Sequence, residues 1–199
     1  MRTSYHTISG ASEGFLKEKN SKFYAYAFPV RSEEDIKTEL SLLRELYPDA
    51  THHCYAWMLG IDKVSERAND DGEPSSSAGK PILRQIYSKD ITNVLVVVVR
   101  FYGGKKLGVP GLIYAYGESA KLALENATVV EKKVMVQFRA SCPFGEEKHI
   151  YRIAKRLGAS MKPEHSMTEF ATRLEIELEK ADDFASAFKE LHKIELERD

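Results

Sequence analysis

The residues best suited to chemistry lie in a glycine-rich basic loop. Residues 100–111 read RFYGGKKLGVPG, in which three basic side chains and four glycines fall close together. A loop of this kind that leads into a helix can direct backbone N–H groups and positive charge at an anion. We therefore expect an anion- or nucleic-acid-binding site formed by Arg100, Tyr102, Gly103, Gly104, Lys105, Lys106, Gly108 and Gly111.

The spacing within this loop matches no established phosphate-binding motif. It is neither G-x-G-x-x-G nor G-x-x-x-x-G-K-[ST], so neither a dinucleotide site nor a Walker loop is supported. The alternative is a tight connection between a strand and a helix, in which the glycines supply positive φ angles and the lysines are solvated. Spacing alone favours neither interpretation.

An acidic segment forms the second candidate. Its members are Asp70, Asp71, Gly72 and Glu73, with Lys80 a short distance beyond. The carboxylates suggest calcium or magnesium, but they lack the ligand series of an EF-hand, and we expect no metal. A solvated functional loop is favoured over a metal site, and such a loop could still interact with the basic loop. Lys80 should lie in the first turn of a helix, where a cation opposes the helix dipole, and this hints at a functional role.

His52 and Cys54 form the third candidate, because an alternating strand would place them on one face. Such a pair can ligate a metal or act as base and nucleophile. No partner ligands at suitable spacing occur elsewhere, so a packed, partly buried pair is favoured. The serines at 75–77 lack a G-x-S-x-G elbow and no H-E-x-x-H occurs, so no catalytic residues are assigned and no cofactor is expected. A binding protein is favoured over an enzyme.

The elements that must position these residues follow from hydrophobic periodicity. The apolar run 94–99 predicts a strand buried on both faces, and a helix is expected from about 112 to 127. The alternating residues 52–59 predict another strand. Between them, 60–77 is expected to be loop and 78–87 a helix.

The remaining pattern predicts an α+β protein of two domains, 1–130 and 131–199. In the first, 13–30 predicts a strand or hairpin, and Ser32 caps a helix that ends before Pro48. In the second, strands and helices alternate in the β-α-β-β-α-β order of a ferredoxin-like fold. Its expected elements are strand 134–141, helix 145–158, a short strand or turn at 161–164, strand 169–178, helix 181–192 and an edge strand within 193–199.

Amino-acid composition limits the class of protein and the kinds of partner that are possible. The 199 residues are 43% hydrophobic, which is ordinary for a globular protein with a real core. The net charge of −1 excludes a global polycation, so nucleic-acid binding would have to come from a local patch. Cys54 and Cys142 are far apart in sequence, which disfavours a disulfide and favours a reducing cytosol. No apolar run reaches transmembrane length, and the first residues lack the layout of a signal peptide.

Three sequence blocks resemble the IMPACT/YigZ family, in its bacterial branch. They are HHCYAW at 52–57, DDGEPSSSAGKPIL at 70–83 and VVVRFYGGKKLGVPGLIYAYG at 97–117, with SKF at 21–23 in addition. The resemblance implies an N-terminal domain similar to domain 2 of a small-subunit ribosomal protein, with a left-handed βαβ crossover. It also implies a C-terminal ferredoxin-like domain similar to the last domain of elongation factor G.

Some positions depart from the family pattern. Ser76 and Ser77 stand where the family usually has Gly-Thr, and Val109-Pro110 replaces the first two residues of Thr-Gly-Gly or Ala-Gly-Gly. Lys106 matches the lysine of the family's Lys-Leu-Gly, whereas Lys105 is an additional charge. Lys106 is therefore the better candidate for contacting a phosphate, and Tyr102 for stacking on a base.

The resemblance implies a cytoplasmic factor linked to translation and its regulation. RNA or the ribosome is the expected partner, a translation-regulating protein is a further one, and no membrane is expected. The main alternative is an enzyme on a phosphorylated or nucleotide-like small molecule, with Lys106 at the anion and Asp70, Asp71 or Glu73 as base or metal ligand. The third interpretation is a regulator that binds protein without nucleic acid.

Overall fold

The computed structural model describes residues 2–62 and 64–198, and contacts divide the chain into two compact units. The N-terminal unit comprises Tyr5–Lys132. The C-terminal unit begins at Lys133 and also contains the first residues of the chain, up to Ser4. The predicted two-domain α+β architecture is therefore confirmed. The sequence did not indicate that the N-terminal residues belong with the C-terminal unit.

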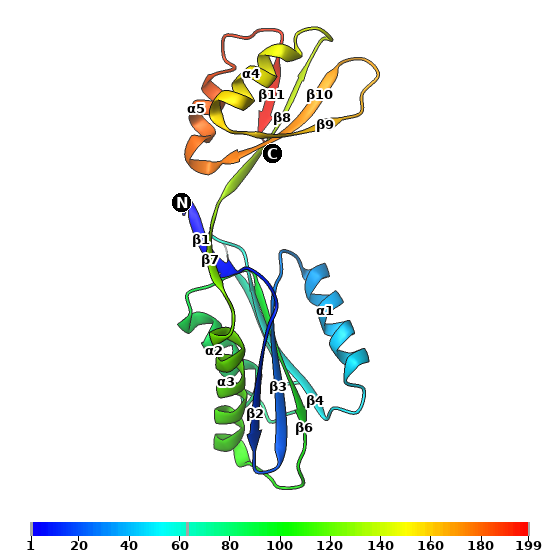
Figure 1. Ribbon diagram of the computed structural model, residues 1–199, viewed down its shortest axis with the longest axis vertical. Helices are drawn as coiled ribbons and strands as arrows, with labels where there is room; N and C mark the ends of the chain where they lie inside the picture. The colour runs from blue at the N-terminus through cyan, green and yellow to red at the C-terminus, as the bar shows by residue number, and fades with distance from the viewer. Residues whose placement is uncertain (1, 63, 199) are drawn as a thin grey trace. The chain divides into compact units, whose positions relative to one another are not determined.

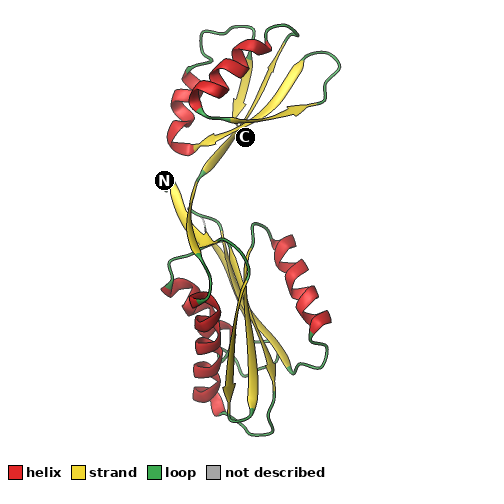
Figure 2. Ribbon diagram, in the orientation of Figure 1, coloured by secondary structure: helices red, strands yellow, loops and turns green. Residues whose placement is uncertain are grey.

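The N-terminal unit is a five-stranded antiparallel sheet between two layers of helix (Figures 1 and 2). Helix α1 (Glu33–Leu46) covers one face, and α2 (Gly79–Ser88) and α3 (Gly108–Glu125) cover the other. The strands, in their order across the sheet, are β2 (Ser12–Glu18), β3 (Ser21–Pro29), β6 (Val94–Phe101), β4 (His52–Leu59) and β5 (Ser65–Asn69).

Strand β6 is the centre of this sheet and is buried on both faces, as predicted. Val94, Val96 and Val98 pack toward α2 and α3. The alternate residues, such as Leu95 and Val97, pack toward α1. A strand that contacts helices on both sides needs a continuous apolar sequence, which explains the run of valines.

The hairpin β2–β3, strand β4 and helix α1 also agree with prediction. The Ser32 hydroxyl accepts the Asp35 N–H at 3.1 Å, and the Asp35 carboxylate accepts the Ser32 N–H at 3.2 Å. This reciprocal capping box fixes the start of α1. Helix α1 joins β3 to β4, and β6 lies between those two strands. The left hand of this crossover stays a prediction.

Two predictions in the N-terminal unit were wrong in their boundaries. Residues 60–77 are not all loop, because β5 pairs with β4 along Ser65–Asn69. Strand β5 could not be recognised from its polar sequence, because an edge strand whose residues are largely exposed needs no alternation of apolar and polar residues. Helix α3 begins at Gly108 rather than at 112 and ends at Glu125. Its Pro110 lies in the first turn, where a missing N–H removes no intrahelical hydrogen bond.

The C-terminal unit has the predicted ferredoxin-like order. Its sheet order is β11-β8-β10-β9, with β11 as the expected edge strand. The elements are β8 (Met135–Cys142), α4 (Glu147–Leu157), β9 (Ser160–Glu164), β10 (Phe170–Glu177), a 3₁₀ turn at Leu178–Lys180, α5 (Ala181–Ser186) and β11 (Glu195–Arg198). Gly158 ends α4 with φ of 77°, the left-handed conformation that glycine adopts readily.

Helix α5 is shorter than predicted, ending at Ser186 instead of 192. Beyond it the chain continues in turns, because Phe188 and Leu191 donate to carbonyls three residues earlier. Phe184 and Phe188 are nevertheless buried in the core of the unit. The apolar spacing therefore indicated the correct core residues but the wrong backbone conformation.

The sequence did not predict a two-stranded ribbon, most of whose residues belong to the N-terminal unit. This ribbon pairs β1 (Ser4–Ile8) with β7 (Val129–Lys133). The chain consequently passes between the units twice, near Ser4 and near Lys132. The Val134 N–H donates to the Thr3 carbonyl at 2.8 Å, which joins the N-terminal residues to the C-terminal unit.

We expect the two units to fold independently, since each has its own buried core. Fragments 1–132 and 133–199 should each unfold in one cooperative transition when circular dichroism is followed during heating. The smaller fragment should melt at the lower temperature, because a short chain buries a smaller share of its surface. Failure of fragment 1–132 to fold alone would contradict this division.

Candidate anion-binding site

The site is built on a row of three residues across the central strands. The strand register places Phe23 of β3 beside Arg100 of β6, and Arg100 beside His52 of β4. Paired residues of antiparallel strands share a face of the sheet. Arg100 also continues the alternation of Val96 and Val98, so the row lies on the face covered by α2 and α3.

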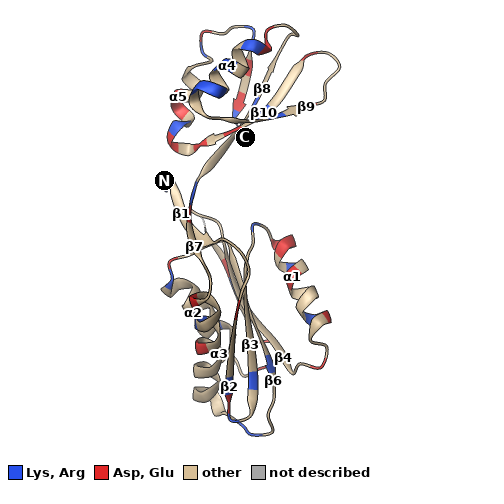
Figure 3. Ribbon diagram, in the orientation of Figure 1, with Lys and Arg blue, Asp and Glu red and all other residues tan. Residues whose placement is uncertain are grey.

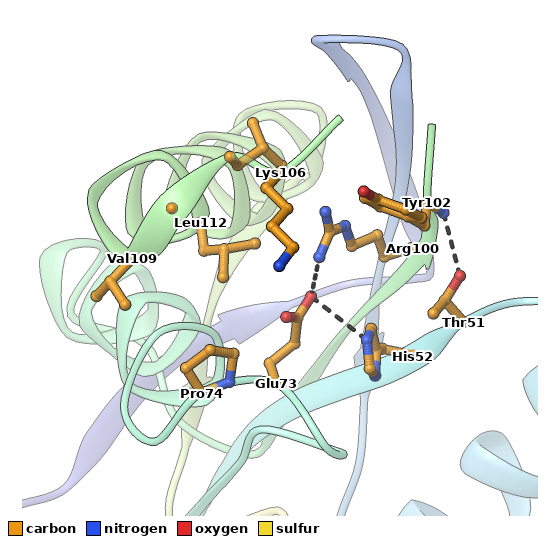
Figure 4. Close-up of a pocket in the computed structure, with 11 residues that line it drawn as sticks. Thr51, His52, Glu73, Pro74, Arg100, Tyr102, Lys106, Val109 and Leu112 are labelled. Atoms are coloured by element: carbon orange, nitrogen blue, oxygen red, sulfur yellow. Dashed lines mark hydrogen bonds and ion pairs between the residues drawn. The ribbon is translucent and has the colours of Figure 1, made fainter. Parts of the chain in front are cut away.

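A cavity of about 520 Å³ opens over this row (Figure 4). The acidic segment and the start of α3 form its other walls. The basic loop and the acidic segment, which are far apart in sequence, are thus brought together as expected. The cavity is lined by Thr51, His52, Glu73, Pro74, Arg100, Tyr102, Lys106, Leu107, Gly108, Val109 and Leu112.

Glu73 is the central polar group of the cavity, and only 5% of its side chain is exposed. Its Oε1 atom is ion-paired with Arg100 and accepts a hydrogen bond of 2.7 Å from the Tyr116 hydroxyl. The His52 Nε2 atom lies 3.8 Å from the same oxygen. Figure 4 shows the carboxylate directed toward Arg100 and His52. Tyr116 was not recognised from the sequence, and its place one helical turn before Ala120 on the buried face of α3 gave no distinguishing signal.

Arg100 is held as firmly as its partner. Its guanidinium lies 5.4 Å from the ring centroid of Phe23 and 5.5 Å from that of Tyr102, which are cation–π contacts. Its Nη2 atom donates to the Ser21 hydroxyl at 3.4 Å. Its Nε atom is buried and has no hydrogen-bond partner. Arg100 is therefore a fixed wall of the cavity, and its charge is balanced by Glu73.

His52 is oriented by the backbone of the acidic segment. Its Nδ1 atom is 2.7 Å from the Asp71 carbonyl, and because a carbonyl can only accept, Nδ1 carries the hydrogen. The Nε2 atom then faces Glu73. A Cβ on Gly72 would lie 3.5 Å from the ring, so this glycine packs directly against His52.

The other two carboxylates of the acidic segment do not line the cavity, so of the three candidates for a base or metal ligand only Glu73 faces it. Asp70 accepts the N–H groups of Ala78 and Gly79 at 3.0 and 2.8 Å, and so caps the start of α2. Asp71 accepts the His53 N–H at 2.6 Å and pairs with Arg44 at 2.9 Å. Both are occupied in holding the segment in place.

The pKa of Asp71 is lowered in the folded protein. Burial acts in the opposite direction, but the His53 N–H and the Arg44 guanidinium stabilise the charged form more strongly. A depressed carboxyl pKa adds stability above the unfolded-state pKa, and this contribution is lost as pH falls through the folded-state value.

Asp71→Asn should therefore lower the free energy of unfolding by about 1–3 kcal/mol at pH 7. The difference from the unchanged protein should shrink as the pH falls below the usual carboxyl value of 3.8. Urea titrations at pH 7 and pH 3 measure it. Asp49→Asn is the control, because Asp49 is exposed and has no ion pair among the described residues. Equal differences at both pH values would contradict the assigned role.

The glycines of the basic loop have different roles. A Cβ on Gly103 would lie 2.1 Å from the Asn20 carbonyl carbon, so the loop can pack on the β2–β3 turn only with glycine there. The Gly103 N–H also donates to the Ser21 hydroxyl at 3.2 Å. Gly104 and Gly108 have φ of 80° and 73°, and Gly111 lies inside α3, where a Cβ would be 3.1 Å from that of Leu107. Part of the loop is thus a tight structural connection, as the alternative interpretation held.

The lysines divide in the same way. Lys106 lines the cavity, whereas Lys105 and Lys80 are exposed outside it. The loop packs against the β2–β3 turn, which carries further exposed lysines (Figure 3). Lys19 lies in this turn, whereas Lys17 and Lys22 are register partners on the opposite face of the sheet from the cavity, because they alternate with Leu16 and Phe23. We call the three lysines Lys19, Lys105 and Lys106 the basic end. None of the three forms an ion pair among the described residues. The sequence did not indicate Lys19, because only the fold brings it to the loop.

Metal and membrane candidates find no support. Within the described ranges, no cluster of three or more His, Cys, Asp or Glu side chains could hold a metal ion. In the same part of the chain, no helix combines the length and apolar character that a membrane crossing needs.

The start of α3 has no side-chain cap and lies at the cavity wall, with Gly108 and Val109 among the lining residues. Its first N–H groups can therefore meet an anion.

The comparisons with known proteins identify the family. Residues 19–124, more than half of the chain, match the family described as the Impact N-terminal domain. This chain belongs to the IMPACT family. The matched range contains every residue that lines the cavity.

Two IMPACT-family proteins of bacteria are similar to this chain at 36% identity. YvyE of Bacillus subtilis aligns over 135 residues, 68% of this chain and 62% of its own length. YigZ of Escherichia coli aligns over 128 residues, 63% of each protein. The aligned parts thus span less than two thirds of these relatives. A crystal structure of a hypothetical protein shares the fold, with a TM-score of 0.78 and 25% identity over 98% of this chain and 97% of that one.

Cys54 lies beside His52 but turns into the core of this IMPACT-family domain. Its Sγ atom donates to the Asp70 carbonyl at 3.0 Å, and the residue is fully buried. Burial raises the pKa of the Cys54 thiol, although a hydrogen bond with Tyr116 acts in the opposite direction. Burial likewise raises the pKa of the Cys142 thiol.

Both thiols should therefore react slowly with a thiol reagent at neutral pH, because the thiolate is the reactive form. We expect labelling of the native protein to be slow and labelling in denaturant to be complete. Mass spectrometry of tryptic peptides separates the two sites. Rapid labelling of Cys54 in the native protein would support the nucleophile interpretation instead.

Proposed function

We propose that this protein is a cytosolic, translation-linked regulatory factor that binds RNA, either free or in the ribosome, through the cavity and the basic end. Membership of the IMPACT family supports the link to translation. The observation that carries RNA binding is Lys106, a cation of the cavity wall without an ion pair among the described residues. Arg100 and Glu73 balance one another, so Lys106 leaves the cavity with an excess positive charge.

The arrangement around Lys106 suits a nucleic-acid phosphate. The uncapped start of α3 adds its N–H groups and the positive end of the helix dipole. Lys19 and Lys105 extend the positive surface beyond the cavity toward the β2–β3 turn, along the path that a chain of phosphates would follow. Tyr102 is 46% exposed at the cavity wall, which leaves one face of its ring free for a base.

The open sheet face of the C-terminal unit offers a less suitable surface. Arg139 and Arg173 are register partners on adjacent strands, on the face of the sheet away from its core. Each donates from Nε to Glu164, at 2.9 and 2.8 Å, and Arg139 is also ion-paired with Glu169. Because these two carboxylates balance the two guanidinium groups, the pair leaves little free charge for phosphate binding on this sheet face.

Replacing Lys106 with alanine tests the proposal. Lys106→Ala should weaken binding to single-stranded RNA of different sequences by a similar factor. It should also make the slope of log K against log salt shallower by about 0.7, the value for one phosphate contact on a single strand. Fluorescence anisotropy across a salt series measures both quantities. The melting temperature should hardly change, because an exposed lysine contributes little to stability.

Lys105→Ala is the matched control, since this neighbouring lysine is exposed but lies outside the cavity. It should lower the affinity less than Lys106→Ala. Equal effects of the two replacements would indicate a diffuse surface instead of a cavity site. Unchanged affinity and salt slope in Lys106→Ala would overturn the proposal and leave the loop as a structural connection. No RNA binding at all would favour the regulator that binds only protein.

A second candidate is an enzyme on a phosphorylated or nucleotide-like small molecule. It is favoured by one observation, the contact of Glu73 with His52 Nε2 inside a cavity of about 520 Å³. Cavities of roughly 300–1,000 Å³ hold small ligands. In this arrangement Glu73 or His52 would act as the base and Lys106 would hold the anion. Turnover of a phosphorylated compound that is lost in His52→Ala would distinguish it from RNA binding.

A further inference from the structure

One oxygen of the central carboxylate is unused by the protein. The Oε1 atom of Glu73 receives Arg100 and the Tyr116 hydroxyl, with His52 nearby. No residue in the described part of the chain donates a hydrogen bond to Oε2, although 95% of the side chain is shielded from solvent. In Figure 4 the interactions drawn from Glu73 also end at a single oxygen. The carboxylate therefore presents an acceptor to the cavity.

This free acceptor restricts what a ligand can place beside it. A carboxylate next to an arginine accepts hydrogen bonds and donates none, so the matching ligand group is an O–H or N–H donor. A phosphate at the same position would meet an oxygen of the same charge. The phosphate must therefore lie at the Lys106 and α3 side of the cavity, and a neutral donor at Glu73.

The order of the lining residues indicates which part of a nucleotide this donor is. Lys106 suits the phosphate, and the exposed ring of Tyr102 suits the base. In Figure 4 the Arg100 guanidinium lies between these two side chains, and the Glu73 carboxylate lies below it. The sugar connects phosphate and base in a nucleotide, so it is the part that would face the Arg100–Glu73 pair. A ribose carries a 2′-hydroxyl donor there, and a deoxyribose does not.

We propose that Glu73 Oε2 accepts a hydrogen bond from a ribose 2′-hydroxyl, and that the cavity thereby selects RNA over DNA. This inference rests on the proposed RNA binding at the same site. The buried Arg100–Glu73 pair and the Tyr116 hydroxyl fix the carboxylate in advance, so the hydrogen bond needs no rearrangement of the protein. A carboxylate that the ligand shields from water and leaves without a donor opposes binding of the deoxy ligand.

The test compares three labelled oligonucleotides with the unchanged protein: oligouridylate, oligodeoxyuridylate and 2′-O-methyl oligouridylate. Uracil has no exocyclic amine, and its N3–H donor is common to the three strands, so a hydrogen bond from the base to Glu73 cannot produce a difference among them. Anisotropy titrations should give an affinity for the ribose strand about 10- to 100-fold higher than for the other two, as expected for one hydrogen bond to a charged group. The 2′-O-methyl strand should resemble DNA, because it keeps the oxygen but lacks the donor.

The Glu73→Gln variant gives a second readout. Its amide can place an N–H where Oε2 stood, and both a 2′-hydroxyl and a 2′-O-methyl oxygen can accept from it, so the preference for the ribose strand over the 2′-O-methyl strand should fall toward equality while the deoxy strand binds no worse. Tyr102→Ala is the matched variant, since it should weaken the ribose and deoxy strands by the same factor and keep their ratio. If Glu73→Gln fails to fold by circular dichroism, the three-strand comparison with the unchanged protein decides alone.

The possible outcomes distinguish selection of RNA by Glu73 from the proposed RNA binding on which it rests. Equal affinities for the three strands, all weakened by Lys106→Ala, would overturn selection by Glu73 and leave RNA binding in place. Tight binding of the 2′-O-methyl strand would also overturn it. No binding of any strand would overturn both.

Discussion

The buried ion pair between Glu73 and Arg100 is the interaction on which the site depends. Two charges with only 5% and 6% of their side chains exposed are stable when further hydrogen bonds and close contacts compensate their lost hydration. Here the Tyr116 hydroxyl supports Glu73, and the Ser21 hydroxyl with two aromatic rings supports Arg100. The pair thus ties the acidic segment, helix α3 and the end of β6 to one another.

The rest of the acidic segment serves this pair. Asp70 caps α2 and Asp71 binds the His53 N–H, so the backbone between them and Glu73 has a defined path. Because Glu73 and Arg100 neutralise each other, the shape of the cavity and its positive charge come from different residues. Glu73 and Arg100 shape the cavity without adding net charge, and the exposed lysines supply the positive surface. This is how a chain with a net charge of −1 can still present a local cationic patch.

The sequence by itself determined most of the secondary structure and the broad architecture. The run 94–99 required a strand with both faces buried, and the alternation in 52–59 placed Cys54 and Ala56 on the same face of a strand. Local apolar periodicity suffices for such elements, because burial acts residue by residue along the strand or helix. Prediction from periodicity missed β5, because its residues are largely exposed and show no apolar alternation. It also extended α5 too far, because apolar residues continue at helical spacing where the chain is no longer helical. The motifs were also sufficient to select the two segments that form the cavity.

Only the tertiary structure decided what each residue of those segments does. Asp70, Asp71 and Glu73 are equivalent in sequence, yet two hold the backbone and one faces the cavity, because their directions depend on contacts with β4 and α2. Likewise, only the packing of Gly103 on Asn20 brings Lys19 of the β2–β3 turn to the basic loop. Such assignments rest on contacts between residues distant in the chain. Sequence periodicity reports the face on which a side chain lies, but not the partner that it meets there.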